Sequence, residues 1–496
     1  MPTVDDAYAD LREHLERYYA LQDVHLNLNW DQQVVMPEAG TPARSTQMAA
    51  VSAVSHDAIT DDAVAACLDE LDGADLSPER AAVVREARRA HREARRVPTD
   101  LIEELSQAEA DAQEAWQRAK AEDDFEQFAP TLERLRDLRL RRAEHIDPDR
   151  DPYRVMYEGL EPRLPLDLVE GVFDDLRDRL VPLIEDLRAA EGDLATLPDE
   201  TWDEETQLAL NRDVVGALGY DFDRGRLDTS PHPFTSGTQY DCRITTRVVP
   251  DEPLDALTAT IHEYGHASYQ LGLPQEHYGT PLGRSYTEIH ESQSRFWENH
   301  VGRTAAFWEW CAPRFNDHLG TDLAPRDLYE AANRIYPENL IRVMADELTY
   351  HLHIILRTEV EKQFVRGEID VAEIPAVWND KMEEYLGVRP ETDAEGCLQD
   401  IHWALVGFAG FESYTVGSVL AAQLDAAMRA DLDSDVDDLI RSGEFEPLLA
   451  WMTDHVHRHG QRYPADELIE RATGEPLTAD YFLEYAESKF GDLYAL

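Results

Sequence analysis

The stretch His262-Glu263-Tyr264-Gly265-His266 constrains the local fold more than any other part of the chain. In an α-helix, residues four positions apart stand about one turn from each other on the same face. His262 and His266 can therefore hold one metal ion together if this segment is helical. Glu263 then lies beside the first ligand, where its carboxylate can take a proton from a metal-bound water. This pattern is typical of zinc peptidases.

The flanking sequence indicates that the pattern lies within a helix. Residues that start a helix precede it, residues that end a helix follow it, and an apolar i, i+3, i+7 set accompanies it. These are Asp251 and Pro253 at the start, Gly272 and Pro274 at the end, and Leu254, Leu257 and Ile261 on the apolar face. The alternative is a chance match, or an ordinary histidine pair on the surface or in the core. The apolar neighbours favour a buried metal site.

The charge balance excludes several classes of partner. The chain has 46 basic and 101 acidic residues, a formal net charge of −55, so it should repel nucleic acid and anionic membranes. Its lysines are only Lys120, Lys362, Lys381 and Lys489. An acidic, lysine-poor surface resembles proteins of salt-loving organisms, because high ionic strength screens the self-repulsion. The aromatic content of 9% and the sustained apolar periodicity argue against a disordered acidic protein.

Cysteine usage and hydropathy predict a soluble, cytoplasmic protein. The four cysteines are scattered without C-x-x-C spacing, so disulfides are not expected. The first 20 residues are charged and amphipathic and lack the apolar centre of a signal peptide. No apolar run approaches the length needed to cross a membrane.

Periodicity predicts a mostly α-helical fold with a small β-sheet next to the helix of His262. No internal repeat or low-complexity linker interrupts the chain, so we predict one large helical body over residues 1–496. Within it, a helical part of about 1–225 precedes a metal-site part of about 226–496. Helices are predicted over residues 4–22, up to about 55, and over 78–96, 99–121, 125–145, 167–190, 201–218 and 337–366.

The only convincing strand, residues 240–249, comes directly before the metal helix, and residues 232–237 before it read as a loop. Side chains alternate along a strand, so Asp241, Arg243 and Thr245 share one polar face. Such a face can belong to a solvated edge strand, or it can line a cleft and pair with an extended peptide. The position directly upstream of the metal helix favours the cleft.

A second helix, starting near Thr287, can return antiparallel to the first and supply a carboxylate as third ligand. Periodicity does not choose among Glu288, Glu291 and Glu298. Glu291 lies opposite Ile289 on the helical wheel, so the pattern alone is equally compatible with a surface glutamate.

Three residues later in the chain are candidates for substrate binding. Arg342 and Asp346 have the i, i+4 spacing of a surface ion pair, but an arginine fork also suits a terminal carboxylate. His402 and Tyr414 lie around a stretch rich in glycine, and either can donate a hydrogen bond to a developing oxyanion. Each can equally be a structural hydrogen-bonding residue.

Six short motifs, in this order, resemble those of the M32 family of metallocarboxypeptidases, the thermostable carboxypeptidase 1 type. They are H-P-F (232–234), D-x-R-x-T (241–245), H-E-x-x-H (262–266), H-E-S-Q (290–293), I-R-x-x-A-D (341–346) and G-x-x-Q-D-x-H-W (396–403). Each is weak except the metal helix, but the ordered set is highly specific. Residues 30–37 also resemble the family, so the similarity spans nearly the whole chain.

The resemblance implies a mostly helical fold with a deep active-site groove, and a homodimer. It implies a hydrolase that releases single C-terminal amino acids from peptides with broad preference and acts poorly on proline. It assigns Glu291 as the third ligand, because Glu291 is the glutamate of the H-E-S-Q motif. The implied cofactor is one Zn²⁺ per chain, and Co²⁺ often supports activity in the family.

We therefore expect Glu263 to be the catalytic base and Arg342 to bind the terminal carboxylate, with Arg243 as second candidate. His232 should shape the same part of the groove. The alternatives are a metallo-endopeptidase or aminopeptidase of the H-E-x-x-H type, and a non-catalytic, metal-stabilised peptide-binding protein. The intact Glu263 argues against the last, since metal binding alone does not need it. The C-terminal side-chain preference, the physiological substrate and the metal loaded in the cell stay open.

Overall fold

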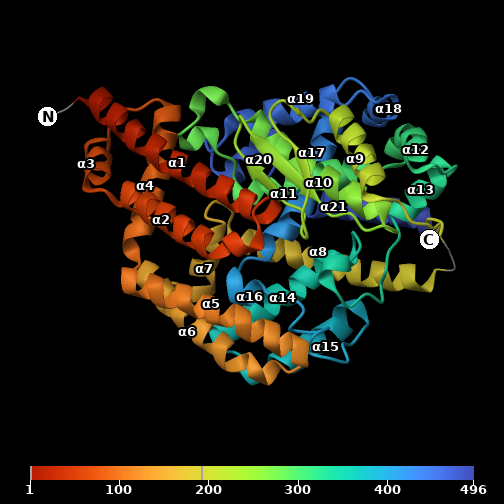
Figure 1. The fold of residues 1–496 in the computed structure, drawn as a ribbon, viewed down its shortest axis with the longest axis horizontal. Coiled ribbons are helices and arrows are strands. Elements are labelled where there is room, and N and C mark those ends of the chain that lie inside the picture. The colour runs from red at the N-terminus through yellow and green to blue at the C-terminus, as the bar shows by residue number, and fades with distance from the viewer. Residues whose placement is uncertain (1–2, 191–193) are drawn as a thin grey trace. The chain divides into compact units, whose positions relative to one another are not determined.

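Helices make up most of the structure, a computed structural model that describes residues 3–190 and 194–496 (Figure 1). Contacts divide the chain into two units, each assembled from three stretches. Unit 1 contains Met1–Arg95, Ala195–Ala332 and Ala421–Pro476, and unit 2 contains Arg96–Leu194, Asn333–Leu420 and Leu477–Leu496. The division near residue 225 that the sequence suggested falls within the second stretch of unit 1.

Unit 1 holds the N-terminal helices, the metal helix and part of the C-terminal region. Its helices are α1 (Val4–Val34), α2 (Thr41–Thr60), α3 (Asp62–Glu70), α4 (Pro78–Arg96), α9 (Glu204–Leu218), α10 (Pro253–Gly272), α11 (Thr287–Arg295), α12 (Ala305–Leu319), α13 (Pro325–Ala332), α18 (Val436–Ser442), α19 (Glu446–His455) and α20 (Ala465–Thr473). Helix α11 continues directly into a π-helical segment, Phe296–Gly302.

Unit 2 is also helical. Its helices are α5 (Thr99–Glu122), α6 (Ala129–Ile146), α7 (Pro152–Leu160), α8 (Leu166–Ala189), α14 (Thr349–Arg366), α15 (Ile374–Leu386), α16 (His402–Leu405) and α21 (Asp480–Tyr494). Helix α17 (Glu412–Asp431) begins in unit 2 and ends in unit 1. The 3-10 turns are Glu38–Gly40, Phe125–Gln127, Gln275–His277, Pro281–Gly283, Arg342–Met344, Val371–Glu373 and His457–His459.

The predicted helices are confirmed, and their ends agree best where the sequence carries a clear start or stop signal. Helix α4 has the predicted bounds 78–96. Helix α1 runs twelve residues beyond the predicted end at residue 22, to Val34. The reason is a buried stripe that continues past residue 22 at helical spacing and keeps that face in the core. Its members are Leu11, Leu15, Tyr19, Asp23 and Trp30.

The helix predicted from residue 337 begins only at Thr349, and this corrects the sequence interpretation. The Asp346 carboxylate accepts hydrogen bonds from the backbone N–H groups of Leu348 (3.0 Å) and Thr349 (2.9 Å), and from the Thr349 hydroxyl (2.8 Å). A carboxylate that satisfies these groups marks the start of a helix. Arg342 therefore lies in a 3-10 turn, and it does not form the i, i+4 ion pair with Asp346 that was the alternative explanation of the spacing.

Three short strands form one small sheet in the order β1-β3-β2, next to α10 as predicted (Figure 1). Strand β3 (Cys242–Thr246) is central, β1 (Leu227–Thr229) pairs with it in parallel, and β2 (Thr235–Gly237) pairs antiparallel. The predicted loop 232–237 thus contains a strand. The solvated-edge interpretation of β3 is wrong, since β3 has a neighbour on both sides and Thr245 on its polar face is fully buried.

Candidate metal centre and active site

Helix α10 is buried on most of its surface, and this fixes which way its histidines point. Leu257 and Ile261 are buried in the core, as the apolar pattern predicted. The Tyr264 hydroxyl donates a 2.6 Å hydrogen bond to the carbonyl of Leu218 at the end of α9. Hydrophobic burial of about 1.5–3 kcal/mol per large side chain holds this orientation.

Gly265, between the two histidines, allows α10 and α11 to come unusually close. A Cβ atom at this position would lie 2.5 Å from the Gln293 carbonyl oxygen and 2.5 Å from the Ser294 Cα. Both are backbone atoms, so no side-chain rotation could relieve the overlap. The two helix backbones therefore touch beside the histidines, so a glutamate side chain on α11 can reach them.

His262, His266 and Glu291 converge as a metal site requires. The Nε2 atoms of His262 and His266 lie 3.7 and 3.4 Å from Glu291 Oε2. Two ligands about 2.0–2.1 Å from one tetrahedral ion would be roughly 3.3 Å apart, so the distances fit such an ion. Within residues 3–190 and 194–496, this is the only group of three or more His, Cys, Asp or Glu residues whose potential ligand atoms all lie within 4.8 Å of one another. Two imidazoles and one carboxylate are also a donor set typical of catalytic zinc.

Glu291 is not the surface residue that the helical wheel also allowed. Its side chain is only 12% exposed, and its second oxygen, Oε1, accepts a 2.8 Å hydrogen bond from Arg295 Nε. Burial would raise the pKa of Glu291, but the charges of His262 and Arg295 outweigh it and hold this pKa well below the usual value. The carboxylate is therefore ionised, the form that a metal ligand needs.

Glu263 lies buried beside the two histidines, only 6% exposed. The Thr235 hydroxyl on β2 lies 2.6 Å from Glu263 Oε2 and 2.9 Å from the Glu263 backbone carbonyl. Its single proton can serve one of these acceptors at a time. Thr235 on the small sheet thus contacts both the carboxylate and the backbone carbonyl of the predicted catalytic base.

The outer nitrogens of the two histidines have different partners. His262 Nδ1 lies 2.9 Å from Glu298 Oε2, and His266 Nδ1 lies 2.6 Å from His290 Nδ1. Burial lowers the pKa of His290, and the neighbouring His266 lowers it further, so His290 is neutral. Burial would also lower the pKa of His262, but the charge of Glu291 and the hydrogen bond to Glu298 outweigh burial, and the pKa of His262 is raised.

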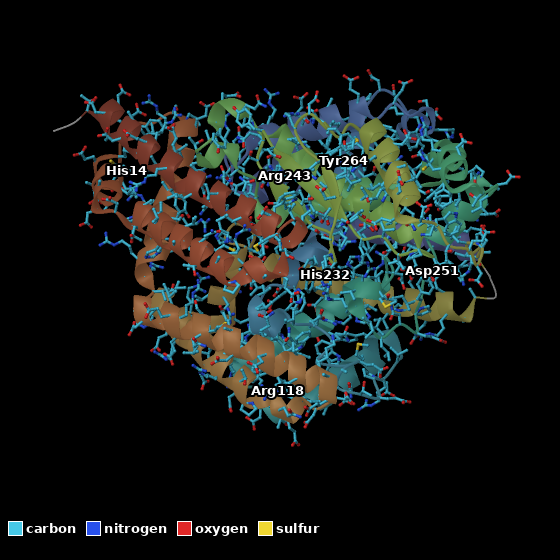
Figure 2. The ribbon with its side chains drawn as sticks, viewed as in Figure 1. His14, Arg118, His232, Arg243, Asp251 and Tyr264 are labelled. Carbon is cyan, nitrogen blue, oxygen red and sulfur yellow. The ribbon has the colours of Figure 1, made fainter. Side chains whose placement is uncertain are left out.

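The two other predicted residues of unit 1 lie on the sheet and in the loop before it. Arg243, on β3, forms a two-point ion pair with Asp241, with distances of 2.9 Å from Nε to Oδ1 and 2.6 Å from Nη2 to Oδ2. It also stacks over Trp30, 4.5 Å from the ring centroid. His232 is exposed, in the loop before β2 (Figure 2). Because Asp241 already neutralises Arg243, this arginine is less suited to a substrate carboxylate.

Arg342, in unit 2, belongs to a buried cluster around Asp400. Arg342 Nη2 lies 2.8 Å from Asp400 Oδ1, and Arg357 Nε lies 2.7 Å from Asp400 Oδ2. Burial would raise the pKa of Asp400, but Arg357 and Arg342 hold it below its usual range. Burial lowers the pKa of Arg357 to about 10, so this arginine stays charged at neutral pH. One carboxylate thus serves two guanidinium groups, and the cluster keeps a net positive charge.

The two predicted oxyanion donors contact each other in unit 2. His402 Nε2 lies 3.4 Å from the Tyr414 hydroxyl, and the His402 ring stacks on Phe411 with centroids 4.5 Å apart. Burial lowers the pKa of His402 to about 4, so its imidazole is neutral at pH 7.

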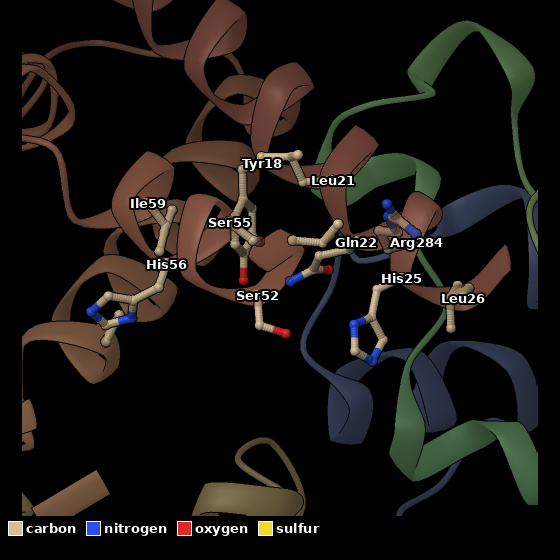
Figure 3. A pocket seen from close by; sticks show the side chains of 12 residues that line it. Tyr18, Leu21, Gln22, His25, Leu26, Ser52, Ser55, His56, Ile59 and Arg284 are labelled. Carbon is tan, nitrogen blue, oxygen red and sulfur yellow. The ribbon is translucent and has the colours of Figure 1, made fainter. Parts of the chain in front are cut away.

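A surface hollow of about 470 Å³ lies between α1, α2, α4 and the segment before α11 (Figure 3). Its polar lining includes Tyr18, His25, His56 and Arg284. Arg284 is already paired with Asp23, at 2.8 Å. The residues described around this hollow do not include the predicted metal ligands, so it is a different feature of unit 1.

Comparison with known proteins then decides the family. A sequence model described as Carboxypeptidase Taq (M32) metallopeptidase matches residues 10–490. The chain belongs to the M32 family. Thermostable carboxypeptidase 1 of Thermus thermophilus is 36% identical, over 99% of this chain and 100% of that protein. Carboxypeptidase 1 of Bacillus subtilis is 34% identical, over 100% of this chain and 99% of that protein.

Solved structures of similar proteins support the same family. The M32 carboxypeptidase of Deinococcus radiodurans superposes with a TM-score of 0.95 at 36% identity, covering 99% of this chain and 100% of that one. Metallocarboxypeptidase 1 of Trypanosoma cruzi gives 0.95 at 32% identity, covering 98% and 100%. The chain is thus a hydrolase that acts on peptides. None of the helices in the described part of the chain combines the length and apolar character that a membrane crossing requires.

Sequence reasoning missed several residues that contact the predicted site residues of this M32 enzyme or their partners. Arg295 has an i, i+4 spacing from Glu291, and this spacing could have identified it. Thr235, Asp400 and Arg357 reach their partners from distant parts of the chain, so no local pattern points to their contacts. Glu298 was considered only as a third metal ligand, whereas in the structure it contacts the far side of His262.

Proposed function

We propose that this M32 enzyme removes single amino acids from the carboxyl ends of peptides with broad side-chain preference. The observation that carries the proposal is the convergence of His262, His266 and Glu291 within 4.8 Å, with Glu263 buried beside them. The names of the relatives, all carboxypeptidases, support the same activity.

We propose Zn²⁺ as the cofactor, one ion per chain, with Co²⁺ as a functional substitute. His262, His266 and Glu291 would hold the ion, and three protein ligands leave a fourth position open. Such an ion lowers the pKa of a coordinated water from about 15.7 to about 7 and polarises the scissile carbonyl.

Glu263 is the proposed general base. Its carboxylate takes a proton from the attacking water and later delivers it to the nitrogen of the leaving amino acid. Thr235 holds this carboxylate in place through the hydrogen bond to Oε2. A positioned general base of this kind typically contributes a factor of about 10²–10⁴ to the rate.

Recognition of the chain end is assigned to Arg342, because its cluster with Asp400 and Arg357 keeps a positive charge. Arg243 is the second candidate, and His232 is proposed to shape the substrate site. His402 and Tyr414 are the proposed donors to the oxyanion. A neutral His402 can donate one hydrogen bond without carrying a charge of its own.

The decisive experiment combines metal analysis with product identification by mass spectrometry, in high salt. Peptides of one sequence would be offered free, N-acetylated and C-amidated. Loss of single residues from the carboxyl end, unchanged by N-acetylation and suppressed by C-amidation, is the expected result. Internal cleavage would indicate an endopeptidase, and sensitivity to N-acetylation would indicate an aminopeptidase.

Glu263→Gln separates catalysis from metal binding in the same assay. The variant should retain the metal and lose turnover by about 10²–10⁴-fold. Full activity of this variant would exclude Glu263 as the base. Activity of metal-depleted native protein would favour a non-catalytic role for the metal.

The deep substrate groove and the homodimer implied by the family resemblance, and the cytoplasmic location predicted from cysteine usage and hydropathy, stay proposals. Sedimentation analysis of the purified protein tests the homodimer directly. A single monomeric species at micromolar concentration would contradict it.

A further inference from the structure

Glu298 makes a contact on the outer side of His262 that the proposed reaction does not use. Glu298 is 8% exposed, and its Oε2 lies 2.9 Å from His262 Nδ1. An ionised carboxylate can only accept hydrogen bonds, so the hydrogen must sit on His262 Nδ1. In the neutral ring that a metal ion requires, the other nitrogen, Nε2, carries the lone pair on the side where Glu291 lies.

Two arginines hold the Glu298 carboxylate in place. Arg295 Nη1 donates to Oε2 at 3.1 Å, and Arg303 Nη2 donates to Oε1 at 3.0 Å. Each arginine is anchored a second time, Arg295 to Glu291 and Arg303 to the Ala332 carbonyl. Both oxygens of Glu298 are therefore engaged, and the side chain has little freedom to leave His262.

The backbone around Glu298 is also not a regular α-helix. Glu298 lies in the π-helical segment Phe296–Gly302, whose seven residues are all buried. In a regular α-helix, Glu291 and Glu298 would stand almost on one face, about 10 Å apart along the axis. A π-helical turn changes the direction of the residues after it, and such turns occur frequently at functional sites.

The partner of His266 is chemically different. His266 Nδ1 faces a second imidazole, that of His290, at 2.6 Å. Of the two outer partners, only Glu298 is a carboxylate, and a carboxylate hydrogen bond makes a histidine a stronger electron donor to a metal ion.

We propose that Glu298 is the positioning residue of the metal centre: its carboxylate, held by Arg295 and Arg303, fixes the tautomer and ring orientation of His262 and thereby raises the affinity for a divalent metal ion. The inference rests on the proposed metal site of His262, His266 and Glu291. In this proposal Glu298 affects metal binding and does not contact the substrate.

The test measures Zn²⁺ affinity of the metal-depleted full chain by competition with a chromophoric chelator. Glu298→Ala should weaken Zn²⁺ binding about 10–100-fold, the usual effect of losing such a partner. Glu298→Gln has the same shape and keeps an acceptor oxygen, so its loss should be smaller. In both variants the visible absorption spectrum of the Co²⁺-loaded protein should shift, which a purely structural role would not produce.

Glu309→Gln is the matched control, because it removes the same charge from the surface of α12, where Glu309 pairs with Arg441. It should leave Zn²⁺ affinity and the Co²⁺ spectrum unchanged. Parental affinity and spectrum in both Glu298 variants would overturn the inference, and the isosteric Glu298→Gln decides if Glu298→Ala does not fold. His262→Ala distinguishes a failure of the Glu298 proposal from a failure of the proposed metal site. If this variant also binds Zn²⁺ as tightly as the parent, the proposed metal site itself is wrong.

Discussion

Asp400 is a single carboxylate that pairs with two arginines, and this pairing sets the net charge of the cluster. Its two oxygens accept hydrogen bonds from Arg342 and Arg357, which are both buried. Two cations and one anion leave one positive charge in a region of low dielectric, where an incoming carboxylate gains more than it would in water. We therefore expect Arg342 to bind the free carboxyl end of the substrate.

Arg342→Ala should lower kcat/KM for peptides with a free carboxyl end by about 10–100-fold, the worth of one or two hydrogen bonds to a charged group. Peptides with an amidated end cannot make these ionic contacts, so their kcat/KM should change far less. Steady-state kinetics on matched acid and amide peptides provide the measurement.

Arg243→Ala is the natural comparison, since Asp241 already neutralises Arg243. It should affect acid and amide peptides alike. Equal losses on both peptide types for Arg342→Ala would remove its proposed role, and a selective loss in Arg243→Ala would transfer that role to Arg243.

At the scale of elements, the close approach of α10 and α11 brings the proposed metal ligands together. The approach depends on the missing side chain at Gly265, since a Cβ atom there would overlap backbone atoms of Gln293 and Ser294. The proposed third ligand, Glu291, lies on the helix that would be pushed away. Stability and metal affinity should therefore respond to the same substitution.

Gly265→Ala should lower the free energy of unfolding by about 1–3 kcal/mol, as overpacking does, and should also weaken metal binding. Chemical denaturation of metal-free protein and a chelator competition provide the two readouts. Gly171→Ala is the control, because a Cβ at this position in α8 meets nothing within 4 Å. Alanine favours a helix over glycine, so the control should be neutral or slightly stabilising. Parental stability and metal affinity in Gly265→Ala would contradict the close-packing argument.

Two buried carboxyl groups, Glu361 on α14 and Glu412 on α17, bind residues of α16 and α7, respectively. Glu412 accepts a 2.5 Å hydrogen bond from the Tyr153 hydroxyl, and Glu361 accepts from Trp403 Nε1 (2.7 Å) and the Ala409 backbone N–H (2.9 Å). Burial raises the pKa of both groups, and the charge of Glu412 raises that of Glu361 further. The pair therefore retains a proton above the usual carboxyl range.

A carboxyl group with a raised folded-state pKa contributes stability that is complete below its unfolded-state pKa and is lost as pH rises through the folded-state value. Glu412→Gln cannot ionise and avoids this loss. Relative to the native protein, its free energy of unfolding should rise by on the order of 1 kcal/mol between pH 5 and pH 8. Urea denaturation at several pH values tests this, and parallel curves for the two proteins would contradict it.

At the scale of the whole molecule, charge repulsion is the dominant feature. Even if every basic residue pairs with an acidic one, the formal charge of −55 remains uncompensated. Salt shortens the range of this repulsion from about 10 Å at 0.1 M to about 3 Å at 1 M. The folded state concentrates the charge more than the unfolded chain does, so it should benefit more from salt.

The melting temperature should therefore rise by several degrees between 0.1 M and 1 M KCl, which calorimetry can measure. Sulfate salts also strengthen hydrophobic burial, so KCl is the better probe of screening. A constant or falling melting temperature in KCl would show that repulsion does not limit the stability of this protein.

The sequence by itself determined the proposed metal-binding pair and the helix that carries it. Two histidines four residues apart meet through helix geometry alone, and the start and stop residues of α10 lie within the same short stretch. The order of the motifs pointed to Glu291, although periodicity could not separate it from Glu288 and Glu298. Glutamates three and seven residues apart share one helix face, so local geometry treats them alike.

Only the tertiary structure decided which partners these residues have. Arg342 meets Asp400, 58 positions away, instead of Asp346, because Asp346 is used at the start of α14. Strand β3 proved central because β1 and β2 flank it, and Glu298 reached the far side of His262 through a π-helical turn. Such contacts depend on how distant segments pack, and no local repeat in the sequence encodes that packing.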